Sequence, residues 1–343
     1  MSENIDHLLN PINHWLDDKT VSEILINQPQ EIWVEQGGQL KRFDIPEFKA
    51  LYLMRLFQLI ANNNEQRLNE NFPLLSGSMP DGSRVQLVLP PTAVYPTLSI
   101  RRKVVRHLSL DDYKASNFYE NATAFDKDAL STDSLNHHEQ ALLMAYEQQD
   151  WDSFIRSAIA LKKVIVVSGG TSSGKTTFLN ACLEAIPKDE RMITLEDARE
   201  IDISHPNKVQ LLASKGEQGN AKVTLQDLVQ CCLRLRPERI IVGEIRGKEI
   251  LDFLAACSTG HEGSITSIHA NNPRMAFMRM TQMYKLNNVP SMTDADIMRE
   301  LNEVIDIIIQ VAKTPQGRQV QGVYYKQAIP QTKRLDRQFN EEK

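Results

Sequence analysis

Two kinds of hydrophobic periodicity alternate in the first hundred residues. Apolar positions recur at helical spacing over residues 5–16 and 47–61. Short apolar runs typical of strands occupy residues 22–26, 31–35, 83–89 and 97–100. The dipeptides Gly37-Gly38 and Asp81-Gly82 mark turns beside these runs. This mixture predicts a small α+β domain over residues 1–107.

The composition becomes polar over residues 108–150, where Asp, Asn and Ser are frequent and one helical stretch stands out near residues 139–146. We interpret this segment as a linker between two domains. The adjacent His137 and His138 have no second ligand pair at metal-binding spacing, so we expect them on a solvated polar face.

From residue 151 onward, short aliphatic strands alternate with amphipathic helices. The predicted strands are residues 164–167, 192–195, 240–242, 264–268 and 305–311. The predicted helices are residues 176–186, 225–235, 248–258 and 273–286, with cap signals at Thr224 with Asp227 and at Asn272-Pro273. Such alternation requires crossover connections, which predicts an α/β domain with a mostly parallel sheet over residues 151–331 and a charged tail over residues 332–343.

Charge and cysteine usage narrow the class of protein. The 343 residues carry 39 basic and 44 acidic side chains, so the chain lacks the cationic excess that drives sequence-independent binding to nucleic acid, and no direct nucleic-acid binding is predicted. The four cysteines, Cys182, Cys231, Cys232 and Cys257, form no CxxC pair and are expected to be buried, reduced thiols. No basic leader and no long apolar segment is present, so we expect a cytoplasmic protein.

A glycine-rich segment carries the strongest chemical signal. Residues 169–176 match the pattern GxxxxGK[ST] and lie between a predicted aliphatic strand and a predicted helix. Glycines in this position let backbone amides surround phosphates at a helix N-terminus. Lys175 is expected to pair with the β- and γ-phosphates of ATP, and the Thr176 hydroxyl to bind Mg²⁺.

Three further clusters follow predicted strands. Glu244 ends the strand over residues 240–242 and is a candidate to hold Mg²⁺ through water or to orient the attacking water. An acidic box, which contains Glu196, follows the strand over residues 192–195. Two histidines, His261 and His269, flank the strand over residues 264–268. Because ligands of a doubly wound sheet bind at the carboxyl edge, we expect these clusters to meet there.

The four motifs GGTSSGKTT, TLEDARE, RIIVGEIRGKE and TGHEGSITSIHAN resemble, in order and spacing, those of the secretion superfamily ATPases. The sequence is most similar to the VirB-type traffic ATPases of type IV secretion and conjugation systems. The resemblance is strong in the C-terminal half and weaker in the N-terminal half, where it covers DGSRVQLVLPP and LSIRRK. It implies a RecA-like P-loop ATPase domain preceded by the smaller α+β domain.

The resemblance also implies roles for individual residues. Glu196 and Glu244 organise Mg²⁺ and the attacking water, and His269 senses the γ-phosphate. Arg101 and Arg102 reach the phosphates from the N-terminal domain, and Arg234 or Arg236 acts within or across a subunit interface. The nucleotide-binding loop comprises Gly169, Gly170, Thr171, Ser172, Ser173, Gly174, Lys175, Thr176 and Thr177. The implied assembly is a homo-hexamer that works with other type IV secretion ATPases and inner-membrane components, and the resemblance also implies peripheral association with that membrane.

Two departures and three alternatives stay open at this point. Ser172 stands where such loops commonly have glycine, and Glu262 replaces a more usual proline, which leaves the role of His261 undecided. A type II secretion or type IV pilus assembly or retraction ATPase is the nearest alternative, although the absence of paired CxxC ligands favours the type IV interpretation. A small-molecule kinase and a nucleotide-binding scaffold without turnover are the others.

Overall fold

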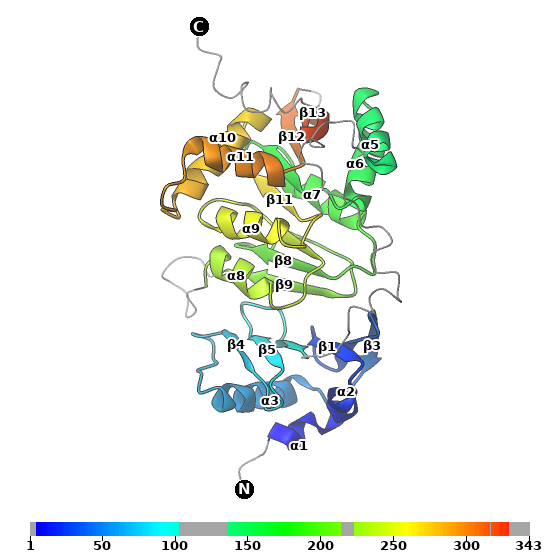
Figure 1. The fold of residues 1–343 in the computed structure, drawn as a ribbon, viewed down its shortest axis with the longest axis vertical. Coiled ribbons are helices and arrows are strands. Elements are labelled where there is room, and N and C mark those ends of the chain that lie inside the picture. The colour runs from blue at the N-terminus through cyan, green and yellow to red at the C-terminus, as the bar shows by residue number, and fades with distance from the viewer. Residues whose placement is uncertain (1–4, 103–135, 214–222, 316, 329–343) are drawn as a thin grey trace, which may run out of the picture.

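Two β-sheets, one in each domain, lie one above the other in the computed structural model, which describes residues 5–102, 136–213, 223–315 and 317–328 (Figure 1). The blue-to-cyan N-terminal sheet is at the bottom of the view and the larger C-terminal sheet is above it. No helix in the described ranges is both long and apolar enough to cross a membrane.

The N-terminal sheet is antiparallel and has the strand order β3-β2-β1-β6-β5-β4. Its strands are β1 Val21–Ile26, β2 Glu31–Gln36, β3 Gln39–Asp44, β4 Leu74–Ser78, β5 Arg84–Val88 and β6 Thr97–Arg101. Helix α3 (Ala50–Asn63) packs its apolar side on one face of this sheet, where Leu53, Phe57 and Ile60 are buried. Pro11 divides the predicted first helix into α1 (Ile5–Leu9), η1 (Asn10–Ile12) and α2 (Asn13–Asp17).

The C-terminal sheet has the strand order β13-β12-β7-β11-β10-β8-β9 and is parallel except for β13. This arrangement confirms the prediction of a mostly parallel sheet. Its strands are β7 Ile165–Gly169, β8 Met192–Glu196, β9 Lys208–Leu212, β10 Arg239–Val242, β11 Ile265–Ile268, β12 Ile307–Thr314 and β13 Gly317–Tyr325, which the short helix η4 (Lys326–Ala328) follows.

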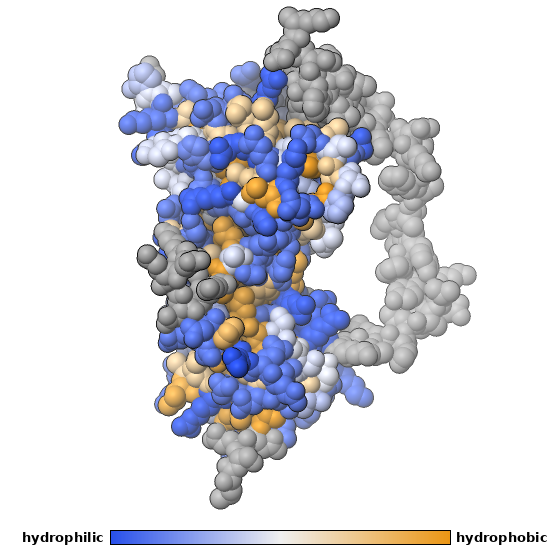
Figure 2. Space-filling view, turned by 90° about the vertical axis from the view of Figure 1, so that its left-hand side faces the viewer, coloured by the Kyte–Doolittle hydropathy of each residue, from blue (hydrophilic) through white to orange (hydrophobic). Residues whose placement is uncertain are grey.

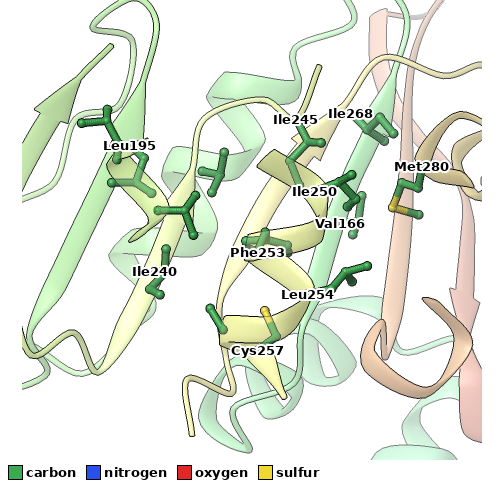
Figure 3. Packing of buried hydrophobic residues seen from close by; sticks show 14 of the residues in the cluster. Val166, Leu195, Ile240, Ile245, Ile250, Phe253, Leu254, Cys257, Ile268 and Met280 are labelled. Carbon is green, nitrogen blue, oxygen red and sulfur yellow. The ribbon is translucent and has the colours of Figure 1, made fainter. Parts of the chain in front are cut away.

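Helices cover both faces of the C-terminal sheet because successive strand residues point to opposite sides. Val166 packs in the cluster that contains α9, whereas its neighbours Ile165 and Val167 pack in the cluster that contains α7 (Figure 3). The first face carries α8 (Leu225–Cys232), α9 (Glu249–Cys257), α10 (Pro273–Lys285) and α11 (Asp294–Val304). The second carries α5 (His137–Glu147), α6 (Trp151–Ala160) and α7 (Lys175–Glu184).

Local signals read from the sequence recur in these helices. Thr224 and Asp227 form a capping box at the start of α8, and the Asn272 side chain accepts a hydrogen bond from the Met275 amide at the start of α10. All four cysteines are buried and free, as expected. His137 and His138 begin α5, which packs on α6 and lies in the segment that the composition marked as polar.

The two domains are joined through the β9 edge of the upper sheet. The Leu212 amide donates to the Thr92 carbonyl (2.6 Å), and the buried Arg191 donates to the side chain of Asn27 (2.8 Å). Arg236 pairs with Glu35 of β2. Hydrophobic residues are exposed along the narrow waist where the domains meet (Figure 2). These contacts hold the two domains against each other.

Candidate nucleotide site

The loop between β7 and α7 has a backbone that few residues can adopt. Gly174 has φ 93° and Ser172 has φ 58°, both in the left-handed region. A Cβ on Gly169 would lie 2.5 Å from both the Ser173 hydroxyl and the Val311 carbonyl oxygen, so a larger residue does not fit there. The loop is therefore compact where it enters α7.

The N-terminus of α7 is open to a ligand. Its cap residue, Gly174, provides no side-chain acceptor for the first amides of the helix. The Lys175 ammonium group folds back and donates to the carbonyls of Gly169 (3.0 Å) and Gly170 (3.1 Å). Burial lowers the pKa of Lys175 from its usual value. Free amides, a helix dipole and a partly desolvated ammonium together favour an anion at this point.

The loop forms one wall of a pocket of about 270 Å³ at the carboxyl ends of the parallel strands. The pocket brings together the predicted Lys175 and Thr176 of α7, Glu196 of β8, Glu244 after β10 and His269 after β11. Thr171 and Ser172 also line it, whereas Gly169, Gly170, Ser173 and Gly174 support it from within the loop and Thr177 follows on α7. Its remaining walls are Asp197, Ala198, Glu200, Ile201, Gly243, Arg246 and Ser267.

Hydrogen bonds hold only one of the two carboxylate oxygens of Glu196. Its Oε1 accepts from the amides of Glu200 and Ile201 at 2.7 Å each, whereas its buried Oε2 has no hydrogen-bond partner among the described residues. Burial raises the pKa of Glu196, and the two amide hydrogen bonds oppose that effect only in part. Across the pocket, the Thr176 hydroxyl donates to Glu200 Oε2 (3.1 Å). Glu196 lines the pocket, and its buried, orphaned carboxylate oxygen could accept from a water molecule or bind a cation after a small movement of the side chain.

Glu244 is tied to a residue that sequence reasoning missed. The Arg246 Nε donates to Glu244 Oε2 (2.8 Å), and its Nη1 donates to Asp197. Both Asp197 and Arg246 lie inside motifs that the sequence analysis identified, but neither was named as a site residue. Arg318 of β13 was not predicted either, and it lies outside these motifs. Its Nε donates to the Ser172 carbonyl (3.3 Å) of the loop.

The donors of the pocket suit Mg²⁺ bound with a phosphate rather than alone. Four carboxylates, from Glu196, Asp197, Glu200 and Glu244, face two cations, from Lys175 and Arg246. In the described ranges no three His, Cys, Asp or Glu side chains converge as a metal-binding group. Mg²⁺ at phosphate sites takes one or two protein ligands and completes its shell with phosphate oxygens and water, so the orphaned Glu196 oxygen and the Thr176 hydroxyl fit that role.

The structure does not bring the predicted arginines into this pocket. Arg101 lines a second pocket of about 540 Å³ between the domains, together with Arg84, Arg234 and Arg236. The two pockets share no lining residue. Arg102 instead donates to the Trp15 carbonyl (3.1 Å) and to that of Asp18, which fixes the N-terminal helices to β6. Within one chain, Arg101 and Arg102 therefore do not reach a phosphate bound at the loop.

The first histidine of the histidine box is also outside the pocket. His261 is half-buried, and its Nδ1 lies 3.1 Å from the Pro237 carbonyl oxygen. Burial lowers its pKa. This position links the ends of β10 and α9, which favours a structural role for His261.

A parallel sheet with helices on both faces, and a glycine-rich loop between a strand and an open helix N-terminus, define an α/β ATPase. Comparisons with known proteins are more specific. The family model described as "Type II/IV secretion system protein" matches residues 6–332. The chain belongs to this family, and within it the chain is a VirB-type traffic ATPase.

Two relatives and one solved structure carry this assignment. The VirB11 protein of the type IV secretion system of Brucella suis is 35% identical over 340 residues, which cover 96% of this chain and 92% of the relative. Protein VirB11 of Agrobacterium fabrum is 35% identical over 306 residues, 88% of each chain. The crystal structure of the Brucella suis VirB11 ATPase, solved with sulphate, has a TM-score of 0.87 and 33% identity, and covers 95% of this chain and 99% of that one.

Proposed function

We propose that the chain is a Mg²⁺-dependent ATP hydrolase that works as a homo-hexamer and powers type IV secretion or conjugative transfer and pilus biogenesis. The convergence of the residue 169–176 loop, Glu196 and Glu244 on one pocket carries the catalytic part of the proposal. Membership of the VirB-type ATPases supports the secretion part. The upper domain is then a RecA-like P-loop ATPase domain.

Each residue of the pocket has a part in the proposed hydrolysis. Loop amides and Lys175 bind the β- and γ-phosphates, and the Thr176 hydroxyl and Glu196 would hold Mg²⁺ directly or through water. Mg²⁺, when bound, neutralises charge on the terminal phosphates. Glu244 orients the attacking water and accepts its proton, while His269 contacts the γ-phosphate from the end of β11. Pocket walls exclude bulk water from the reacting phosphate.

The second pocket suggests why a ring is needed. Arg84, Arg101 and Arg234 bring positive charge to a cavity that this chain does not connect to its own loop. Lys175 and Arg246 only partly offset four carboxylates and a bound triphosphate, so further positive charge from outside the pocket would stabilise the nucleotide. We infer that Arg101, together with Arg234 or Arg236, reaches the nucleotide of a neighbouring subunit, which makes turnover depend on assembly. Arg102 acts indirectly, by fixing the strand that carries Arg101.

The proposed partners follow from relatives that are named for type IV secretion systems. They are other ATPases and inner-membrane components of such a system, with peripheral association at that membrane and no direct contact with nucleic acid. The excess of 44 acidic over 39 basic side chains supports the absence of direct contact with nucleic acid.

Native mass measurement and phosphate release, each with and without ATP, test the proposal together. The expected result is a hexamer that releases phosphate from ATP with water as the acceptor. Glu244→Gln is expected to lower kcat by about 100-fold or more while it preserves nucleotide binding, since a general base is lost and the loop is intact. The matched control is Glu262→Gln, outside the pocket. A monomer that transfers phosphate to an added hydroxyl compound would instead identify a kinase.

A further inference from the structure

Arg246 connects the carboxylates of Glu244 and Asp197, two like charges that repel each other. Its guanidinium donates to Glu244 Oε2 through Nε and Nη2, and to Asp197 Oδ2 through Nη1. Glu244 follows β10 and Asp197 follows β8, so the arginine bridges the ends of two neighbouring strands across the mouth of the pocket. The bridge occupies the carboxylate that the proposed hydrolysis needs free.

The backbone and the side chain of Arg246 differ in freedom. The buried Glu249 fixes the backbone, because its Oε1 accepts from the amides of Arg246 (2.6 Å) and Gly247 (2.8 Å). The Arg246 side chain, in contrast, is 58% exposed. A side chain of this kind can exchange partners while its Cα stays in place, without any rearrangement of β10 or α9.

We propose that Arg246 is a positioning residue that ties Glu244 to Asp197 in the empty pocket and transfers to the terminal phosphate when a triphosphate binds. The inference rests on the proposed nucleotide site. Guanidinium binds phosphate oxygens in the same bidentate manner as carboxylates, and a triphosphate carries more negative charge than either carboxylate. The transfer leaves Glu244 unpaired, so its carboxylate can orient water only once the substrate is present.

A double-mutant cycle on nucleotide affinity separates this exchange from a general effect of charge. The variants are Asp197→Asn, Arg246→Ala and the double variant. The probe is a non-hydrolysable ATP analogue, titrated in the presence of a metal chelator so that neither turnover nor metal binding contributes. If Asp197 competes with phosphate for Arg246, Asp197→Asn tightens binding by about three- to tenfold in the wild-type background and by less than about twofold in the Arg246→Ala background.

A second cycle provides the matched control. Glu200→Gln also removes one negative charge from the pocket, but among the described residues no hydrogen bond or ion pair joins Glu200 to Arg246, whose pKa Glu200 raises only through its charge. Its effect is expected to differ less between the two backgrounds than the effect of Asp197→Asn. Arg246→Lys, which keeps the charge without the forked geometry, replaces Arg246→Ala if thermal melts show that the alanine variant does not fold.

The outcomes separate the two proposals. Equal effects of Asp197→Asn in both backgrounds, with wild-type binding intact, overturn the bridge and leave the ATPase assignment standing. Absence of wild-type binding overturns the nucleotide site, and the bridge falls with it. Coupling between Asp197 and Arg246 that clearly exceeds the coupling between Glu200 and Arg246 supports the exchange.

Discussion

Ser172 holds a backbone conformation that disfavours most side chains, at φ 58° in the middle of the nucleotide loop. Ser172→Val is expected to lower the free energy of unfolding by about 1–3 kcal/mol, because a β-branched residue is strained there. Ser172→Gly relieves that strain and is expected to preserve nucleotide affinity, since the loop is proposed to bind phosphate through its amides. Denaturant titrations of both variants check this pair, and equal destabilisation by valine and glycine would contradict it.

Glu23 gives the molecule a pH-dependent stability. Burial raises its pKa to about 7, although Arg101, Arg236 and Arg191 lower it and Glu35 raises it. The native state therefore holds a proton that the unfolded chain releases between pH 4.5 and about 7. Stability should fall as pH rises through this window, by at most about 3 kcal/mol.

The measurement for Glu23 is the unfolding midpoint against pH for the wild type and Glu23→Gln. The amide cannot ionise, so the variant is expected to lack the loss of stability between pH 4.5 and about 7. Other titrating groups contribute equally to both proteins and cancel in the difference. Parallel curves would show that Glu23 is not the group responsible.

The residues of the nucleotide site were predictable to the extent that they belong to ordered motifs. The loop, Glu196, Glu244 and His269 were named from sequence, and the structure places them around one pocket. Arg246 was not, because its link to Asp197 spans 49 residues and no spacing rule predicts it. The chemical roles of these residues stay predictions. The position of Arg101 at the end of a strand did not predict which of the two pockets its side chain lines.

At the scale of elements, one buried ion pair joins the start of β10 to the segment that precedes β8. Arg239 at the start of β10 is fully buried and donates to both carboxylate oxygens of Glu190, at 2.7 Å and 2.9 Å. Burial raises the pKa of Glu190, but the hydrogen bonds and charges of Arg239 and Lys162 outweigh it and hold the net pKa below its usual value. The pair therefore stabilises the fold at neutral pH, and its contribution is lost as acid protonates Glu190.

Glu190→Gln should lower the free energy of unfolding by about 3 kcal/mol or more, because it leaves the Arg239 charge buried without a carboxylate. Asp152→Asn, in an exposed pair with Arg156, is the control and should leave the midpoint unchanged. Chemical denaturation at neutral pH measures both. A Glu190→Gln midpoint as high as that of the control would contradict the assigned role.

Several elements that the sequence analysis missed have a weak hydrophobic signal. The strand β9 alternates buried and half-buried residues, and much of β13 is exposed because it pairs only with β12. The helix α11 is rich in acidic residues, and its buried face became recognisable only through packing against α10. The helix α6 was also missed, although it buries Phe154, Ala158 and Ile159. Central strands such as β7, which are buried on both faces, were predicted because their apolar runs are continuous.

At the scale of the whole molecule, a buried arginine connects the two domains. Arg191 is fully buried, and burial lowers its pKa to about 9, so it is charged at neutral pH. Its guanidinium donates to the side chains of Asn27 and Asn207 and to the Leu235 carbonyl (2.9 Å). Amide oxygens, rather than a carboxylate in direct contact, therefore solvate the charge at the junction.

Asn27→Ala removes the only hydrogen bond that Arg191 donates to a described side chain of the N-terminal domain. We expect a loss of about 1–3 kcal/mol, since an N–H of a buried cation loses its acceptor. Calorimetry is expected to show two thermal transitions where the wild type shows one. Asn63→Ala, at the exposed end of α3, is the control, and an unchanged single transition for Asn27→Ala would contradict the role of the junction.

The packing of the domains could not be predicted from the sequence. Asn27 and Asn207, which form a hydrogen bond of 3.1 Å, lie 180 residues apart, and neither belongs to a motif. The residue patterns predicted two folds, one α+β and one α/β, and both sheets are present. Which edge of one sheet meets the other depends on shape and charge that appear only after folding.

Calorimetric titration of the purified protein with ATP and Mg²⁺ tests the central claim most directly. We predict saturable binding for the wild type and a loss of affinity of at least about tenfold for Lys175→Ala, which keeps the fold but removes the ammonium group from the loop. Equal affinity of the wild type and Lys175→Ala, or no binding by folded wild-type protein, would contradict the account.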